Sequence, residues 1–286
     1  MNITRLLLKT DYDLFPSKFD DYVKLKNNIG STFLLYFNLP NSTIPIINDE
    51  VDDELISASE SNVEKQSFTE TDDQNSNEIV YETFFSQLSH RFSVFNSLSF
   101  EELQADLFLD TCEEYFSLVD KFNSPIFTPV KADVNGNIAK LRRKLNQNPS
   151  KFQTLFAIVN DEIESQTTQA RNSATDALLW LKRAFEFLSS FLHQFSVGDK
   201  SLVDAVNKAY EFSLKPHHGM LARSVFSIAL RAVPNKDDFI RSLAVHPADA
   251  FDPRFVDQTF KEMSKQASDI TSVLRKITLF YSKHGL

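Results

Sequence analysis

Three polar residues in the stretch KADVNGNIAKLRRKL have the types and spacing of a binding site for a polar headgroup. Asp133, Asn137 and Lys140 lie at positions i, i+4 and i+7, so a helix places them in one narrow stripe. Together they offer a carboxylate acceptor, an amide that both donates and accepts, and an ammonium. This set suits a ligand rich in hydroxyl groups or phosphate oxygens. The alternative, more common for such a pattern, is a solvent-exposed face with an i,i+4 pair.

The stretch ATDALLWLKRAFEFLSSFL carries the single tryptophan of the chain. On a helix, Trp180 shares one stripe with Phe187 and Phe191, and Asp176 lies one turn earlier. Leucines and Phe185 form a second apolar stripe, which predicts a central helix that is buried on two sides. A sugar ring can stack on a flat aromatic face, although an indole that only fills the core is the simpler interpretation.

His218 begins a third feature, in KPHHGMLARSVFSIALRAVP. A stripe of small or β-branched residues follows it at Ala222, Val225 and Ala229. Small residues either let two helices approach closely or leave room for a ligand. His218 therefore suits a hydrogen-bonding group at the mouth of an apolar tunnel, while a structural histidine is the more common alternative.

The motifs of common enzymes are missing from the sequence. There is no GxSxG, HExxH, CxxC or Gly-rich phosphate loop. Cys112, the only cysteine, lies among apolar helix residues, which predicts a small buried side chain rather than a nucleophile. One cysteine supports neither a disulfide framework nor a cysteine-based zinc site, which is typical of a reducing compartment. We therefore expect no catalysis, no metal and no cofactor.

These residues belong to a chain whose second part reads as all helix. From Tyr81 onward, apolar residues recur with a helical period, and no alternating strand pattern occurs. Prolines such as Pro129 and Pro216 separate the helical stretches. The 27 phenylalanines and only 5 glycines indicate a large apolar interior or an apolar cavity. We predict an all-α domain over residues 81–286, without the roughly 18–20 consecutive apolar residues that a membrane-spanning helix needs.

The negative charge of the chain comes from one segment. The net charge is -9, but residues 47–80 hold 11 acidic residues and 1 basic residue, while residues 81–286 hold 24 of each. We predict that 47–80 is a disordered acidic linker, because it has too little apolar surface to offset its ordering entropy. Residues 1–46 form an N-terminal arm that we cannot assign. The charge balance argues against nucleic acid as a partner.

Several of these stretches, in order, resemble the glycolipid transfer protein family. They are SPIFTPVKADVNGNIAK, ATDALLWLKRAFEFL, and HHG followed by FSIALRAVP, within a similarity that runs from about Thr83 to Leu286. The stretch QARNSATDALLWLKR resembles in particular the C-terminal lipid-transfer domain of the four-phosphate adaptor proteins, which are glucosylceramide carriers with a pleckstrin-homology domain. The resemblance implies a two-layer all-α sandwich that encloses one sphingolipid in a tunnel.

The resemblance also implies roles for single residues. Asp133, Asn137, Lys140 and Trp180 match the sugar-headgroup positions of the family. His218 matches the position that, together with Asp133, holds the ceramide amide. Other residues match positions that line the acyl tunnel: Phe122, Phe127, Val130, Phe187, Leu214, Phe226 and Leu230.

Some positions depart from the family pattern. Many members have a tryptophan that touches the membrane where this chain has Met220, which lacks the interfacial preference of tryptophan. Asp176 is acidic in the adaptor subgroup but apolar in single-domain members, and it could contact the sugar or disfavour an anionic headgroup. No pleckstrin-homology domain precedes the linker, so phosphoinositide targeting is not expected from these residues.

We therefore predict a non-enzymatic, cytosolic carrier that binds a glycosphingolipid and contacts membranes transiently. A ceramide-1-phosphate carrier on the same fold is the nearest alternative. Trp180 and Asn137 disfavour it, because a phosphate site would use arginines, and Arg142 and Arg143 lie off the polar stripe. A further alternative is an interaction protein that senses lipid. This alternative is supported by the stretch ETFFSQL at 82–88, which resembles the acidic-tract and FF motif that binds endoplasmic-reticulum VAP receptors. An aromatic pair in a first helical turn is the simpler interpretation of this stretch.

Overall fold

The computed structural model describes residues 80–197 and 201–286. The predicted arm 1–46 lies outside the described residues, and so does the predicted linker except for Val80. Within the described part, the chain is helical and has no strand beyond two isolated bridges. The all-α prediction is therefore confirmed.

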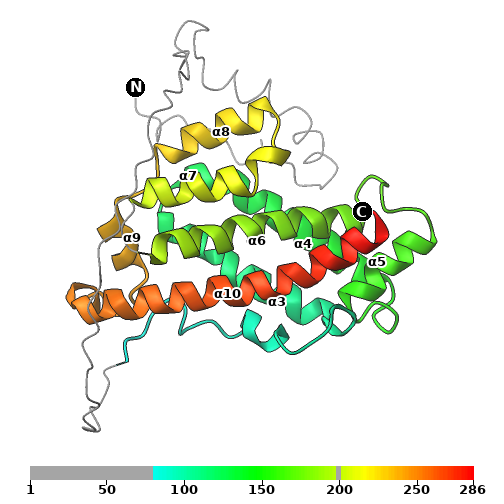
Figure 1. Ribbon diagram of the computed structural model, residues 1–286, viewed down its shortest axis with the longest axis horizontal. Helices are drawn as coiled ribbons and strands as arrows, with labels where there is room; N and C mark the ends of the chain where they lie inside the picture. Colours follow the sequence, from blue (N-terminus) through cyan, green and yellow to red (C-terminus); the bar gives the residue numbers. More distant parts are fainter. Residues whose placement is uncertain (1–79, 198–200) are drawn as a thin grey trace, which may run out of the picture. The chain divides into compact units, whose positions relative to one another are not determined.

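Eight α-helices and several short 3-10 helices make up the described domain (Figure 1). The α-helices are α3 (Ala105–Phe116), α4 (Thr128–Gln147), α5 (Leu155–Glu164), α6 (Ala174–Ser196), α7 (Leu202–Phe212), α8 (Met220–Leu230), α9 (Lys236–Ser242) and α10 (Pro253–His284). The 3-10 helices are η2 (Phe92–Phe95), η3 (Phe100–Glu102), η4 (Ser117–Phe122), η5 (Pro125–Phe127), η6 (Lys215–His217) and η7 (Asp249–Phe251).

The prolines mark helix starts more often than gaps. Pro129 does not separate two helices as the sequence predicts, because it lies in the first turn of α4. A proline is tolerated there, since the first N–H groups of a helix have no partner within it. Pro253 begins α10 in the same way, and Asp252 caps that helix by accepting from the Arg254 N–H.

Helix α6 is the centre of the fold. It packs against α10, α4, α7 and α5. Figure 1 shows α8, α7, α6 and α10 in succession across the domain, with α3 and α4 in a second layer behind. The second stripe predicted on this helix is buried throughout: Leu178, Leu181, Phe185, Leu188 and Leu192. The prediction of a central helix in a two-layer helical sandwich is confirmed.

The interior between α3, α6 and α10 is built from interlocking aromatic rings. Phe92 lies 4.9 Å from Tyr115 and 5.3 Å from Phe185, measured between ring centroids. Phe92 and Phe185 have no exposed surface. Cys112 is buried in the same core, and burial raises the pKa of its thiol. It is therefore a small core side chain, as predicted.

A buried carboxylate fixes the start of α6. Glu162 on α5 accepts from the backbone N–H groups of Ala174 and Thr175, both at 2.8 Å, and from the Thr175 hydroxyl. Tyr281 on α10 donates to the Thr175 carbonyl, and burial raises the pKa of this tyrosine. Three helices thus meet at the first turn of α6, which comes just before Trp180.

The segment that precedes η2 is fastened to α10. Tyr81 exchanges two backbone-to-side-chain hydrogen bonds with Gln258, and the Phe84 N–H donates to the Leu243 carbonyl. Phe85 is 1% exposed. In the folded domain this member of the FF pair is a core residue and offers no free side chain to a receptor. VAP binding itself stays a prediction that the structure does not test.

Candidate functional site

The polar stripe on α4 points inward. The Asn137 amide donates to the Asp133 carboxylate over 3.3 Å, and the Lys140 ammonium donates to the Asn137 oxygen over 3.5 Å. Asn137 is 2% exposed, and its two neighbours in the stripe are half-buried. Both hydrogen bonds are long and therefore weak. The residues form a partly desolvated polar row, which differs from the solvent-exposed face of the alternative interpretation.

Trp180 and His218 lie against each other. Their ring centroids are 6.1 Å apart and the rings are inclined by 26°. The Tyr210 hydroxyl on α7 lies 3.2 Å from the His218 Nδ1 atom. The histidine therefore connects α6, α7 and the turn before α8.

The pKa of His218 depends in part on a carboxylate of α4, which relates the Trp180–His218 pair to that helix. Burial lowers the pKa of His218, and the Asp133 carboxylate opposes that change by attracting a proton. Because the pKa lies below its usual value, the imidazole is neutral at pH 7 and offers one donor and one acceptor. His218 thus lies beside Trp180 and within electrostatic range of Asp133, and Asn137 and Lys140 follow Asp133 in the α4 row.

Asp176 lies at the edge of this group. It is half-buried in the first turn of α6, and its N–H donates to the Ser173 hydroxyl that caps the helix. Its carboxylate attracts the positive charge of the Arg183 guanidinium, two turns along the same helix, and so opposes the lowering of the pKa of Arg183 by burial.

Arg183 is a neighbour of Trp180 that the sequence reasoning missed. Its guanidinium carbon lies 4.8 Å from the centroid of the Trp180 ring. The i,i+3 spacing in WLKR is the signal that predicts this contact. Of the two arginines considered on α4, Arg142 forms ion pairs with three carboxylates of α3, those of Asp106, Asp110 and Glu113.

The apolar positions fall into two aromatic groups. Phe122 lies 5.1 Å from Phe127, and Phe187 lies 6.4 Å from Phe226, between ring centroids. Phe226 also stacks on Tyr210 at 3.5 Å. The remaining predicted tunnel positions are half-buried or exposed, and they are Leu214, Leu230 and Val130, of which Val130 is 42% exposed.

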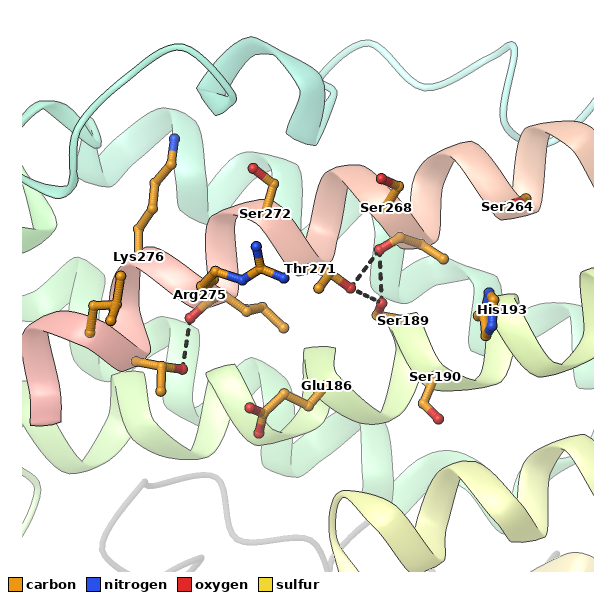
Figure 2. A pocket seen from close by; sticks show the side chains of 14 residues that line it. Glu186, Ser189, Ser190, His193, Ser264, Ser268, Thr271, Ser272, Arg275 and Lys276 are labelled. Atoms are coloured by element: carbon orange, nitrogen blue, oxygen red, sulfur yellow. Dashed lines mark hydrogen bonds between the residues drawn. The ribbon is translucent and has the colours of Figure 1, made fainter.

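Two surface hollows lie outside the group formed by Asp133, Trp180 and His218, and the second of them is lined in part by the predicted tunnel residue Phe127. A groove of about 970 Å³ runs between α6 and α10 and is lined mainly by small hydroxyl side chains and Arg275 (Figure 2). Ser189 bridges its walls by contacting Thr271 and the Ala267 carbonyl. A second hollow of about 610 Å³ lies beside the start of α4. Neither Asp133 nor Trp180 lines either hollow, so both differ from the predicted headgroup site.

The described residues also bear on metal binding and on membrane spanning. Within residues 80–197 and 201–286, no group of three or more His, Cys, Asp and Glu side chains is arranged to hold a metal ion. Across the same residues, every helix is either too short or too polar to span a bilayer.

The chain is similar in sequence to a known protein family and to several of its members. Residues 103–245 match the family model of the glycolipid transfer protein (GLTP). The pleckstrin homology domain-containing family A member 8 of Homo sapiens is 38% identical over 207 residues, which cover 72% of this chain and 40% of that protein. The glycolipid transfer protein of Xenopus tropicalis is 39% identical over 165 residues, which cover 53% of this chain and 79% of that protein. The chain thus spans about 40% of the length of the pleckstrin-homology relatives.

Solved structures agree with these matches. A structure that addresses how FAPP2 selects simple glycosphingolipids using the GLTP fold is 38% identical, with a TM-score of 0.66 over 71% of this chain and 97% of that chain. The human ceramide-1-phosphate transfer protein bound to its lipid is 19% identical, with a TM-score of 0.58 over 68% of this chain and 95% of that chain. The second likeness supports the fold alone.

Proposed function

The chain belongs to the glycolipid transfer protein family, and on this premise we propose that it carries a glycosphingolipid with a simple, glucosylceramide-like headgroup between membranes. The observation that carries the proposal is the Trp180–His218 ring pair, which lies beside Tyr210 of α7 and within electrostatic range of Asp133 on α4. Residues 81–286 form the carrier domain in this proposal, with 47–80 as a linker and 1–46 as an arm. The carrier makes and breaks no covalent bond.

The polar row would recognise the headgroup and the ceramide amide. The Asp133 carboxylate can accept from an amide N–H and from a hydroxyl, and the neutral His218 ring can complete the amide contact. Asn137 and Lys140 can donate to sugar oxygens. The Trp180 ring offers a flat surface for the C–H face of a sugar.

The apolar side would shield the lipid chains from water. Each buried CH₂ group is worth about 0.8 kcal/mol, which is why a two-chain lipid does not cross water unaided. Phe187 and Phe226 are half-buried and pack against the core, so they present apolar surface that is not fully used by the protein itself. They are suitable walls for an acyl chain.

Membrane contact would take place at the start of α8. Met220 is 84% exposed, and Phe212 at the end of α7 is 77% exposed. An exposed methionine can insert between lipids without the interfacial anchoring of tryptophan. We therefore propose transient binding to membranes by a carrier that works in the cytosol.

Transfer of labelled glucosylceramide between vesicles tests the proposal. Trp180→Ala and Asp133→Val should each lower the initial transfer rate more than about tenfold while the helical circular dichroism spectrum stays unchanged. Asp120→Val is a matched control, because Asp120 forms an exposed ion pair with Lys131 outside the site. Wild-type transfer rates in both site variants would contradict the proposal.

A ceramide-1-phosphate carrier is a second candidate. Arg183 supports it, since a guanidinium beside Trp180 is a cation close to the headgroup site. Native mass spectrometry of the lipid that co-purifies from a sphingolipid-producing cell separates the two candidates. A phosphorylated ceramide as the major lipid would replace our proposal with this one.

A lipid-sensing interaction protein is a third candidate, and it requires binding to a VAP-type receptor. The buried Phe85 disfavours binding through 82–88 while the domain stays folded. Receptor binding without any vesicle-to-vesicle transfer would favour this candidate.

A further inference from the structure

Arg183 contacts Trp180 and forms no other strong interaction in the described part of the chain. Its guanidinium carbon is 4.8 Å from the indole centroid. Among the described residues it takes part in no hydrogen bond and no ion pair. The preceding cation, Lys182, has an ordinary partner, because its ammonium lies 2.7 Å from the Glu186 carboxylate. Of these two neighbouring cations of α6, Lys182 therefore pairs with a carboxylate, whereas Arg183 contacts an aromatic ring.

The surroundings of Arg183 show why the indole contact matters. The side chain is half-buried, and burial lowers the pKa of its guanidinium, while the Asp176 and Glu186 carboxylates at longer range oppose that change. A guanidinium remains charged in proteins, so its partial desolvation needs compensation. The face of an aromatic ring supplies it, and arginine is well suited because its planar group stacks on rings.

Trp180 in turn needs a support. Its side chain is half-buried, so the core does not enclose it. The His218 ring, which also lies beside the indole, comes from the short segment between α7 and α8 rather than from α6. A binding site keeps its affinity only when its contact groups are held close to the productive geometry. Arg183 lies on the same rigid helix as Trp180, one turn later.

We propose that Arg183 is a positioning residue of the headgroup site, which holds the Trp180 ring in the orientation that receives a sugar. The inference rests on the proposed function and adds a residue to it. The guanidinium covers part of the indole, and this contact uses none of the five N–H donors of the arginine. The residue acts through Trp180, so its effect is specific to lipids that carry a sugar.

The single tryptophan gives a direct readout of this contact. Because Trp180 is the only tryptophan, its fluorescence reports on the site alone. Arg183→Gln should raise the accessibility of Trp180 to acrylamide in the protein without added lipid. It should also weaken binding of glucosylceramide presented in phosphatidylcholine vesicles by about fivefold, the size expected for a partly buried cation–π contact. Binding of ceramide without a sugar should not change.

Two further variants make the test specific. Lys182→Gln removes a cation from the adjacent position, where it pairs with Glu186, and should behave as wild type in both lipid titrations. Arg183→Lys keeps the charge but loses the planar group, and should restore only part of the sugar-dependent affinity. In a Trp180→Leu background, Arg183→Gln should have no further effect on the residual glucosylceramide binding.

Three results would overturn the inference. The first is an equal loss of affinity of Arg183→Gln for glucosylceramide and for ceramide. The second is an unchanged accessibility of Trp180 to acrylamide in that variant. The third is the same loss of glucosylceramide affinity when Arg183→Gln is introduced into the Trp180→Leu background. Failure of the proposed function gives a different result, since the wild-type protein would then bind glucosylceramide no better than ceramide. The acrylamide measurement remains informative in that case, because it needs no lipid.

Discussion

Two regions of the domain use phenylalanine in opposite ways. Between α3, α6 and α10 the rings are closed off from solvent, as at Phe185 with 0% and Phe108 with 1% exposed surface. On the α7–α8 side the same residue type is left partly open, and Phe212 is 77% exposed. Within α8, all of which the structure describes, only Ala229 is buried although most of its residues are apolar. Apolar composition alone therefore does not distinguish an enclosed core from a partly open apolar surface.

The difference shows that burial, rather than residue type, assigns the roles. A fully enclosed ring stabilises the fold through both transfer from water and close packing. A ring left open contributes less to folding, and its remaining surface is available to a ligand. The first region is thus expected to control stability, and the second to control lipid loading.

The largest effect is expected from a cavity in the first region. Phe185→Ala removes a ring that packs on Phe92 and Phe116 and should lower the free energy of unfolding by about 3–5 kcal/mol. Urea denaturation, monitored by circular dichroism, measures this change in the free energy of unfolding. Phe185→Leu, which keeps most of the volume, should cost much less. A loss under about 1 kcal/mol for the alanine variant would remove the distinction between the regions.

A smaller stability effect, with a large functional one, is expected in the second region. Phe226→Ala should cost about 1–2 kcal/mol, because the ring is only half-buried, yet it removes the surface shared by Phe187 and Tyr210. Glucosylceramide transfer should fall by at least about fivefold. Phe226→Leu should restore most of the transfer. Full transfer by the alanine variant would show that α8 is not part of the lipid site.

The smallest effect on stability is expected at the start of α8. Met220→Trp changes a side chain that is 84% exposed, so unfolding should shift by no more than about 0.5 kcal/mol. Binding to phosphatidylcholine vesicles in a sedimentation assay should rise by about threefold or more, because tryptophan favours the interface. Met220→Ser should reduce binding. Equal binding by all three proteins would place the membrane contact elsewhere.

Much of the fold was predictable because helix signals are local. The period of apolar residues and the lack of alternation predicted the all-α domain, and the two stripes of α6 predicted a central helix. Pro129 was misread, since a proline has opposite meanings in a helix interior and in a first turn. The predictions for residues 1–46 and for nearly all of 47–80 lie outside the described residues.

The candidate site was predictable only in part. The row Asp133, Asn137 and Lys140 follows from one helix, so its spacing was sufficient to find it. The approach of His218 to Trp180 and Asp133 involves segments far apart in the chain, and the sequence suggests it only through the family resemblance. Arg183 was missed although it lies three residues from Trp180, because a cation beside a tryptophan on a helix is usually solvated.

By itself, the sequence determined the helical class, the polar row on α4, the central place of α6 and the concentration of acidic charge in 47–80. These properties depend on neighbours within about two helical turns or on simple counting. The tertiary structure decided which phenylalanines are enclosed and which stay open, that Glu162 fixes the start of α6, and that Arg183 lies over Trp180. Burial and side-chain contact are properties of how helices pack, and distant segments of the chain supply the packing partners.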